Sequence, residues 1–122
     1  MLCITLKEKD MRNLSKLVFI FSSLAASLAM AADAKIDIIS PADGAKVDAK
    51  SHVTLSYEIT RGGGSDHAHL YVDGREATLL RQEKGSYTLD LLEPGVHQIC
   101  AKMVDKNHTP TGVERCIKVT AQ

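Results

Sequence analysis

An all-β sandwich of about seven short, antiparallel strands is the fold that the sequence predicts for residues 32–122. Runs of strand-forming residues alternate with turn signals at intervals of roughly 8–12 residues, the rhythm of a sandwich or barrel. In residues 52–60 (HVTLSYEIT), apolar and polar side chains alternate, as expected for a half-buried strand. No segment after residue 35 keeps a 3.6-residue apolar period long enough to favour a helix. Together these observations favour an immunoglobulin-like sandwich.

The expected strands are separated by glycine, proline and aspartate. Asp73-Gly74 is typical of a two-residue hairpin, and residues 41–44 (PADG) and 93–95 (EPG) mark further turns. The chain has no tryptophan, so a true antibody-type domain with its Cys…Trp…Cys spacing is excluded. The strands are expected at residues 35–40, 52–60, 67–72, 75–81, 86–92, 97–104 and 113–120.

A removable leader is predicted before this domain. Residues 17–30 (LVFIFSSLAASLAM) carry no charge, and they follow the basic residues Arg12 and Lys16. Ala29 and Ala31 flank the last residue of this run in an A-x-A pattern, which is typical of signal-peptide cleavage. We therefore predict a signal peptide at residues 1–31 and one mature domain at residues 32–122.

Two further expectations follow from the leader. Met11 is the better candidate for the start, because residues 1–10 add charges of both signs ahead of an otherwise ordinary leader. A membrane-spanning helix is the alternative reading, but it needs about 20 apolar residues. We expect no stable membrane span after cleavage, and a periplasmic or secreted protein of bacterial origin.

Composition narrows the function. The chain has 15 basic and 15 acidic side chains, a balance that argues against nucleic-acid binding. It contains no GxSxG, HExxH or Walker motif, and the glycines at 62–64 lead into a strand and not into a helix. The first hypothesis is therefore a non-enzymatic binding or accessory module, with an unknown protein or small ligand as its partner.

Two cysteines, Cys100 and Cys116, remain after the leader is removed. An even count in an exported protein favours a disulfide. If the chain folds back symmetrically around residues 105–112, Cys100 lies opposite Cys116 and Met103 lies opposite Val113. A redox-active or metal-binding thiol pair is the alternative, although a separation of 16 residues has no CxxC character.

The histidines carry the most chemical information. His67 and His69 alternate in an expected strand, so both imidazoles and Tyr71 project from one face. Such a pair can bind one metal ion if a third ligand comes from elsewhere. His108 is the main candidate, with Asp66 and Asp105 as alternatives. The competing interpretation is that surface histidines only stabilise loops.

The other two histidines are weaker candidates for a metal. His97 shares the strand parity of Ile99 and is expected to be half-buried, so it is a less favoured ligand. His52 stands among outward-facing polar residues and offers no argument for a site.

Three motifs together resemble a known group of proteins. They are HAHLYVDG (67–74), EPGVHQI (93–99) and DKNHTP (105–110). In this order they are similar to an uncharacterised family of small secreted bacterial domains with the pattern HxH…DG…PGxH…DxxHxP. The resemblance spans residues 40–119 and implies an exported immunoglobulin-like sandwich, but it brings no established activity. Its pattern includes all the histidines except His52, and it does not include the cysteine pair.

Two hypotheses stand beside the accessory module. One is a periplasmic copper- or zinc-binding protein that uses His67, His69 and His108. The other is an enzyme of the superoxide-dismutase type, since that β-structured class also uses a His-x-His strand. Its further ligands cannot be identified in this short chain, so we expect no enzyme activity.

Overall fold

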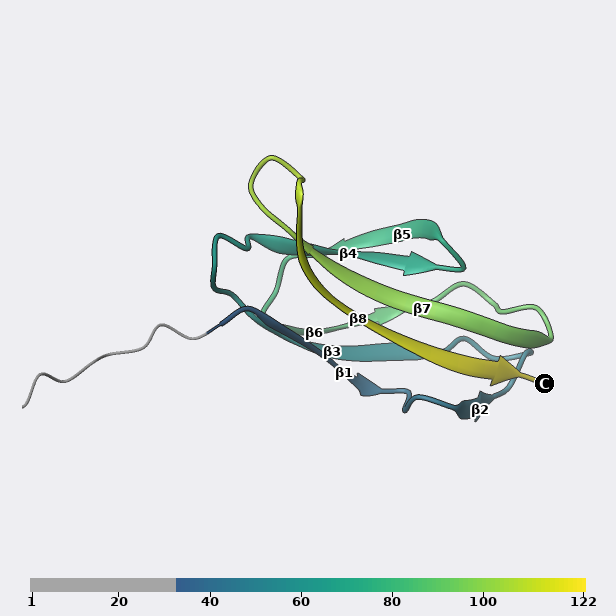
Figure 1. Ribbon diagram of the computed structural model, residues 1–122. Coiled ribbons are helices and arrows are strands. Elements are labelled where there is room, and N and C mark those ends of the chain that lie inside the picture. The colour runs from purple at the N-terminus through teal and green to yellow at the C-terminus, as the bar shows by residue number, and fades with distance from the viewer. Residues whose placement is uncertain (1–32) are drawn as a thin grey trace, which may run out of the picture. The chain divides into compact units, whose positions relative to one another are not determined.

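Two β-sheets pack face to face in the computed structural model, which describes residues 33–122 (Figure 1). The predicted leader and its cleavage site lie outside the described residues. The strands of residues 33–122 are β1 (Lys35–Ser40), β2 (Ala45–Val47), β3 (Thr54–Thr60), β4 (His67–Val72), β5 (Arg75–Leu80), β6 (Lys84–Thr88), β7 (Gly95–Val104) and β8 (Pro110–Ala121). The prediction of an all-β sandwich is confirmed, with eight strands where about seven were expected.

The smaller sheet has the order β1-β3-β6 and is antiparallel throughout. Its central strand follows the predicted alternation, because Leu55, Tyr57 and Ile59 are buried while their neighbours are not. Gly85 lies opposite Tyr57. A Cβ atom on Gly85 would lie only 2.7 Å from the Tyr57 hydroxyl oxygen, so glycine makes room for this ring in the core.

The larger sheet has the order β2-β8-β7-β4-β5. The expectation of a purely antiparallel sandwich is wrong at β2, which pairs in parallel with the end of β8. The turn before β2 is tied to β8 by two contacts: the Gly44 N–H donates to the Lys118 carbonyl at 2.7 Å, and the Lys118 N–H donates to the Asp43 carboxylate at 2.8 Å. The chain therefore leaves the smaller sheet after β1 and joins the edge of the larger one.

The two hairpins of the larger sheet confirm most of the predicted registers. Asp73 and Gly74 have φ values of 52° and 80°, as a two-residue turn of the hairpin type requires. Cys100 pairs with Cys116, and the two form a disulfide. The predicted pairing of Met103 with Val113 is wrong, because the register shifts after Lys102 and brings Val104 opposite Pro110. As a result β8 starts three residues earlier than predicted, and the connecting turn shortens to residues 105–109.

Two other boundaries differ from the prediction. Residues 89–92 leave the sheet after β6, although Leu89 and Leu92 are buried in the core. The spacing of their apolar side chains resembles that of a strand, which is why the sequence predicts a strand as far as residue 92, but the backbone strand ends at Thr88. Residues 52 and 53 precede β3, and the His52 ring there donates from Nδ1 to the Leu89 carbonyl at 2.9 Å.

No helix among the described residues is long and apolar enough to cross a membrane.

Candidate metal centre

Strand β4 presents His67 and His69 on the outer side of the larger sheet. The residues between and after them, Ala68 and Leu70, are fully buried in the core. The two histidines are nevertheless only 2% and 9% exposed. The turn between β7 and β8 accounts for this burial, because its His108 ring packs edge-on against both, with ring centroids 4.6 Å from His67 and 5.1 Å from His69.

The β7–β8 turn is built around Asp105. Its carboxylate accepts backbone N–H bonds from Asn107 at 2.8 Å and Thr109 at 2.9 Å. The backbone of Asp105 also pairs with that of Thr109, and its carbonyl accepts the N–H of His108. These bonds hold His108 at a φ of 63°, the left-handed region that non-glycine residues seldom adopt. The turn thus directs the His108 ring toward β4.

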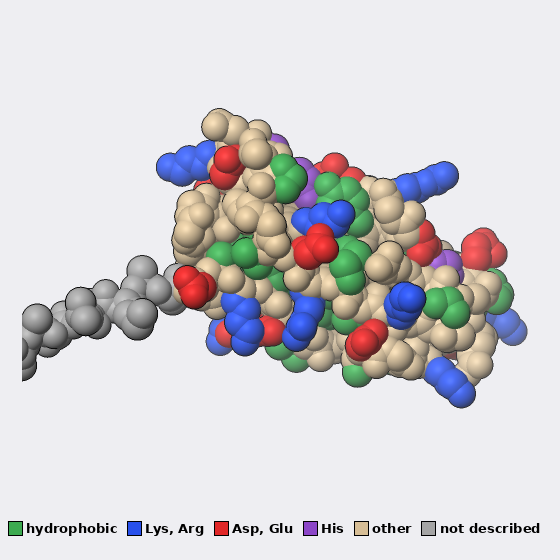
Figure 2. All heavy atoms as spheres, in the orientation of Figure 1, with side chains coloured by type: hydrophobic (Ala, Val, Ile, Leu, Met, Phe, Trp, Pro, Cys, Tyr) green, Lys and Arg blue, Asp and Glu red, His purple; other side chains and the backbone are tan. Residues whose placement is uncertain are grey.

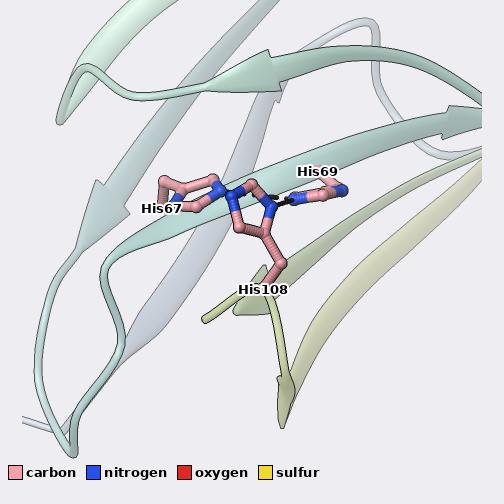
Figure 3. Close-up of side chains that lie close together, drawn as sticks. All are labelled: His67, His69 and His108. Carbon is pink, nitrogen blue, oxygen red and sulfur yellow. Dashed lines mark hydrogen bonds between the residues drawn. The ribbon is translucent and has the colours of Figure 1, made fainter. Parts of the chain in front are cut away.

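Three ring nitrogens converge as a result (Figure 3). The Nε2 atoms of His67 and His69 lie 3.2 Å apart, and Nδ1 of His108 lies 3.0 Å from Nε2 of His69. One nitrogen from each residue falls within 4.8 Å of both others. Residues 41 positions apart in the sequence therefore meet at one point.

Carboxylates occupy the far sides of the two buried rings. Nδ1 of His67 donates to Asp66 at 2.9 Å, and Nδ1 of His69 lies 3.1 Å from the Glu76 carboxylate. A proton on Nδ1 of each neutral ring leaves its Nε2 with a lone pair. The two Nε2 lone pairs then face each other with no proton between them, an arrangement that a bound cation would relieve.

Burial keeps the central ring in its neutral form. The pKa of His69 is lowered below its ordinary value of 6.5, mainly because burial disfavours the charged ring. The nearby Glu76 carboxylate raises this pKa, while His67 and His108 add to the lowering. A neutral imidazole is the form that binds a metal ion.

The spacing of the nitrogens suits a transition metal. Four ligands placed tetrahedrally at about 2.0 Å from zinc lie roughly 3.3 Å from one another. The separations of 3.2 and 3.0 Å are close to that value. Three imidazoles can supply three of the four positions, and imidazole is a suitable ligand for both zinc and copper.

The structure separates the sequence-predicted candidates into two groups. His67, His69 and His108 come together. The alternatives Asp66 and Asp105 do not join them as ligands, because Asp66 bonds the far side of His67 and the Asp105 carboxylate is taken up by the turn. Cys100 and Cys116 form a disulfide, so the alternative of a free thiol pair does not apply here.

Glu76 is the residue of this site that sequence reasoning missed. Its signal was present in the hairpin, because a two-residue turn at 73–74 places Val72 opposite Arg75 and hence Tyr71 opposite Glu76. Facing strand partners share one side of a sheet. Glu76 therefore had to lie on the side of the two strand histidines.

His97 lies elsewhere and is fully occupied. Its Nδ1 donates to the Asp73 carboxylate, and its Nε2 donates to the Glu93 carbonyl at 2.6 Å. These bonds raise the pKa of His97 above 6.5, the Asp73 bond most and the Glu93 carbonyl next. No ring nitrogen of His97 is left for a metal.

An open pocket of about 420 Å³ adjoins His97, between β5 and the segment that follows β6. Glu76 lines the pocket as well as contacting His69, but the three converging histidines are not among the residues that line it. This pocket and the candidate metal centre are therefore different places.

Comparison with known proteins bears on the fold. The chain is similar to a solved structure of the fibronectin(III)-like modules of Clostridium thermocellum CbhA, with a TM-score of 0.56 and 15% identity over 71% of this chain and 96% of that one. The fold matches a fibronectin III-like module. A lytic polysaccharide monooxygenase from Jonesia denitrificans is less similar in structure, with a TM-score of 0.48 and 22% identity over 67% of this chain and 60% of the other.

No family model and no curated protein matches the chain. The likeness to fibronectin III-like modules, at 15% identity, speaks for the fold alone. The resemblance to a family of small secreted bacterial domains stays a prediction.

Proposed function

We propose that this domain is an exported, non-enzymatic metal-binding module whose centre of His67, His69 and His108 takes one zinc or copper(II) ion. The observation that carries the proposal is the convergence of three ring nitrogens at separations of 3.0 and 3.2 Å. The metal would be the ligand of the accessory module that the sequence predicts.

Two further features support a metal over a purely structural cluster. Three imidazoles that only stabilised a turn would gain by exchanging N–H donors and acceptors. Here the two carboxylates hold the Nδ1 protons of His67 and His69, so neither Nε2 atom can donate to the other. The turn that carries His108 is also held by Asp105 independently of any ion. The site is thereby organised before the ion arrives, which lowers the cost of binding.

Export to the bacterial periplasm or beyond is part of the proposal. The Cys100–Cys116 disulfide is typical of proteins that mature outside the reducing cytoplasm. The predicted leader agrees with this location. Cell fractionation followed by N-terminal sequencing of the mature protein is expected to find an exported chain that begins at Ala32.

Calorimetric titration of the metal-free protein tests the metal centre. We expect Zn(II) and Cu(II) each to bind with one ion per chain, and the double variant His67→Ala/His69→Ala to bind neither. His52→Ala is the matched control. The His52 ring lies before β3, away from the three converging histidines, and its hydrogen-bond partner is the Leu89 carbonyl. Identical isotherms for the wild type and the double variant would end the proposal.

A second variant separates loss of a ligand from loss of folding. His108→Gly removes the third imidazole, and glycine adopts the left-handed φ of this position without strain. We expect the variant to keep its thermal stability without metal and to bind zinc at least tenfold more weakly. Undiminished zinc binding by His108→Gly would remove this residue from the centre.

A further inference from the structure

Two carboxylates lie behind the candidate centre and not within it. Asp66 bonds Nδ1 of His67 at 2.9 Å, and Glu76 lies 3.1 Å from Nδ1 of His69. They come from different places, since Asp66 directly precedes β4 and Glu76 belongs to the edge strand β5. Each of the two buried imidazoles therefore has a carboxylate of its own.

A partner of this kind acts on a metal ligand in two ways. It fixes which ring nitrogen carries the proton and how the ring is oriented, and it makes the ligating nitrogen more basic. It also brings a negative charge close to the ion. The first effect acts through the histidine and the second acts through space, because each carboxylate contacts Nδ1 while the converging nitrogens are Nε2.

We propose that Asp66 and Glu76 are positioning residues that make the three-histidine centre selective for a divalent over a monovalent cation. The inference rests on the proposed metal-binding function. Three neutral imidazoles carry no net charge, so these two carboxylates are the negative groups in contact with the ligand rings. Together they match the charge of Zn(II) or Cu(II) and exceed that of Ag(I) or Cu(I).

Coulomb's law gives this proposal a quantitative form. The attraction between a fixed charge and an ion is proportional to the charge of the ion, so the removal of one carboxylate charge costs a divalent ion twice the free energy that it costs a monovalent ion. A hundredfold loss of affinity for the divalent ion then accompanies a tenfold loss for the monovalent one. The cations of Arg61, Lys106 and Arg81 also act on this region, and they stay the same in every variant below.

The amide variants isolate the charge. Asp66→Asn and Glu76→Gln keep a side-chain oxygen that can accept the Nδ1 proton, but they carry no charge. The affinities for Zn(II) and Ag(I), the second a monovalent ion without redox chemistry under these conditions, are measured by calorimetry on the wild type and on Asp66→Asn/Glu76→Gln. We expect zinc affinity to fall about 100-fold, the upper end for loss of such partners, and silver affinity to fall about tenfold.

A control and a second readout keep the test specific. Glu58 is a matched carboxylate, because its side chain is 46% exposed against 49% for Glu76 and it lies on β3 in the other sheet. Glu58→Gln is expected to change neither affinity. Long-range proton–nitrogen NMR of the metal-free protein is expected to find the protons of His67 and His69 on Nδ1 in the wild type, and to find this preference weakened in Asp66→Ala/Glu76→Ala.

The possible outcomes divide cleanly. Equal fold-losses for zinc and silver, or no loss for either ion, would overturn the selectivity. Protons on Nε2 of the wild-type rings would overturn the positioning role. A wild-type protein that binds neither ion would instead refute the proposed function. If the double variant folds poorly, Glu76→Gln alone gives the same comparison, since its half-exposed side chain lies on an edge strand.

Discussion

Strand β4 has a histidine–carboxylate pair near each end, and the two pairs differ in whether the histidine keeps a ring nitrogen available for a metal ion. At its start His67 bonds Asp66, and at its end Asp73 bonds His97. Figure 2 shows histidine atoms at the surface in two separate places. At the first end the carboxylate occupies one ring nitrogen and leaves the other directed at two more imidazoles. At the second end a carboxylate and a carbonyl occupy both nitrogens.

The difference shows what turns a histidine into a candidate ligand. Both ends place a ring beside a carboxylate, so the presence of the pair decides nothing. The decisive feature is the second nitrogen. A ring that donates from both nitrogens is favoured as the imidazolium and ties segments together, whereas a ring that donates from one keeps a lone pair for a metal.

Zinc should stabilise the protein through the histidines at the start of β4 and not through His97 at its end. Zinc at about 1,000 times its dissociation constant is expected to raise the free energy of unfolding by about 4 kcal/mol, since it binds the folded chain. His67→Ala/His69→Ala should lose this increase, and His97→Gln should keep it in full. Thermal melts with and without zinc measure both. A zinc effect that depends on His97 would break the distinction between the two ends.

The disulfide links β7 to β8, and β7 pairs with the whole length of β4. Removal of the disulfide should lower the stability of the fold without changing the metal centre. Cys100→Ala/Cys116→Ala is expected to lower the free energy of unfolding by about 3 kcal/mol, because the bond closes a loop of 16 residues in the unfolded chain. Urea unfolding of the metal-free protein measures this loss.

Zinc affinity of the same cysteine variant should stay within tenfold of the wild type, because Asp105 and not the disulfide holds the His108 turn. A larger loss would mean that the geometry of the centre depends on the whole hairpin.

The sequence predicts the strand half of the centre well and the turn half poorly. The alternation of β4 is enough to place His67 and His69 on one side, because successive residues of any strand point in opposite directions. The approach of His108 depends instead on a register shift after Lys102 and on a left-handed φ. Both arise from how Asp105 bonds the turn, which no periodicity records.

The fold follows the same division. Strands with alternating apolar residues, such as β3, are recognisable from local sequence. Strand β2 is not, because its three residues carry too short a pattern and its place depends on a parallel pairing with β8, far away in the chain. Leu89 and Leu92 cause the opposite error, a strand predicted where none forms, because residues in irregular segments also bury apolar side chains.

The pair of Asp73 and His97 at the end of β4 should make the stability of the protein depend on pH. The pKa shifts of these two residues define the pH range. The pKa of Asp73 lies below its ordinary 3.8: burial raises it, but the bonds from His97 and from the Gln98 N–H outweigh burial. Stability from Asp73 is therefore present above pH 3.8 and lost as the pH falls through the lower, folded pKa. The pKa of His97 lies above 6.5, so its stability is present below pH 6.5 and lost as the pH rises through the higher, folded pKa.

The pair thus contributes most between pH 3.8 and 6.5. His97→Gln should remove this contribution, which we expect to be no more than about 1 kcal/mol because the Asp73 side chain is half-exposed and solvent screens the pair. Urea unfolding of the metal-free wild type and variant at pH 5 and pH 9 measures it. The gap between the two proteins should be larger at pH 5. An equal difference in unfolding free energy at pH 5 and pH 9 would show that His97 acts through neutral hydrogen bonds. The two ends of β4 would then differ in the geometry of their hydrogen bonds and not in the charge of their histidines.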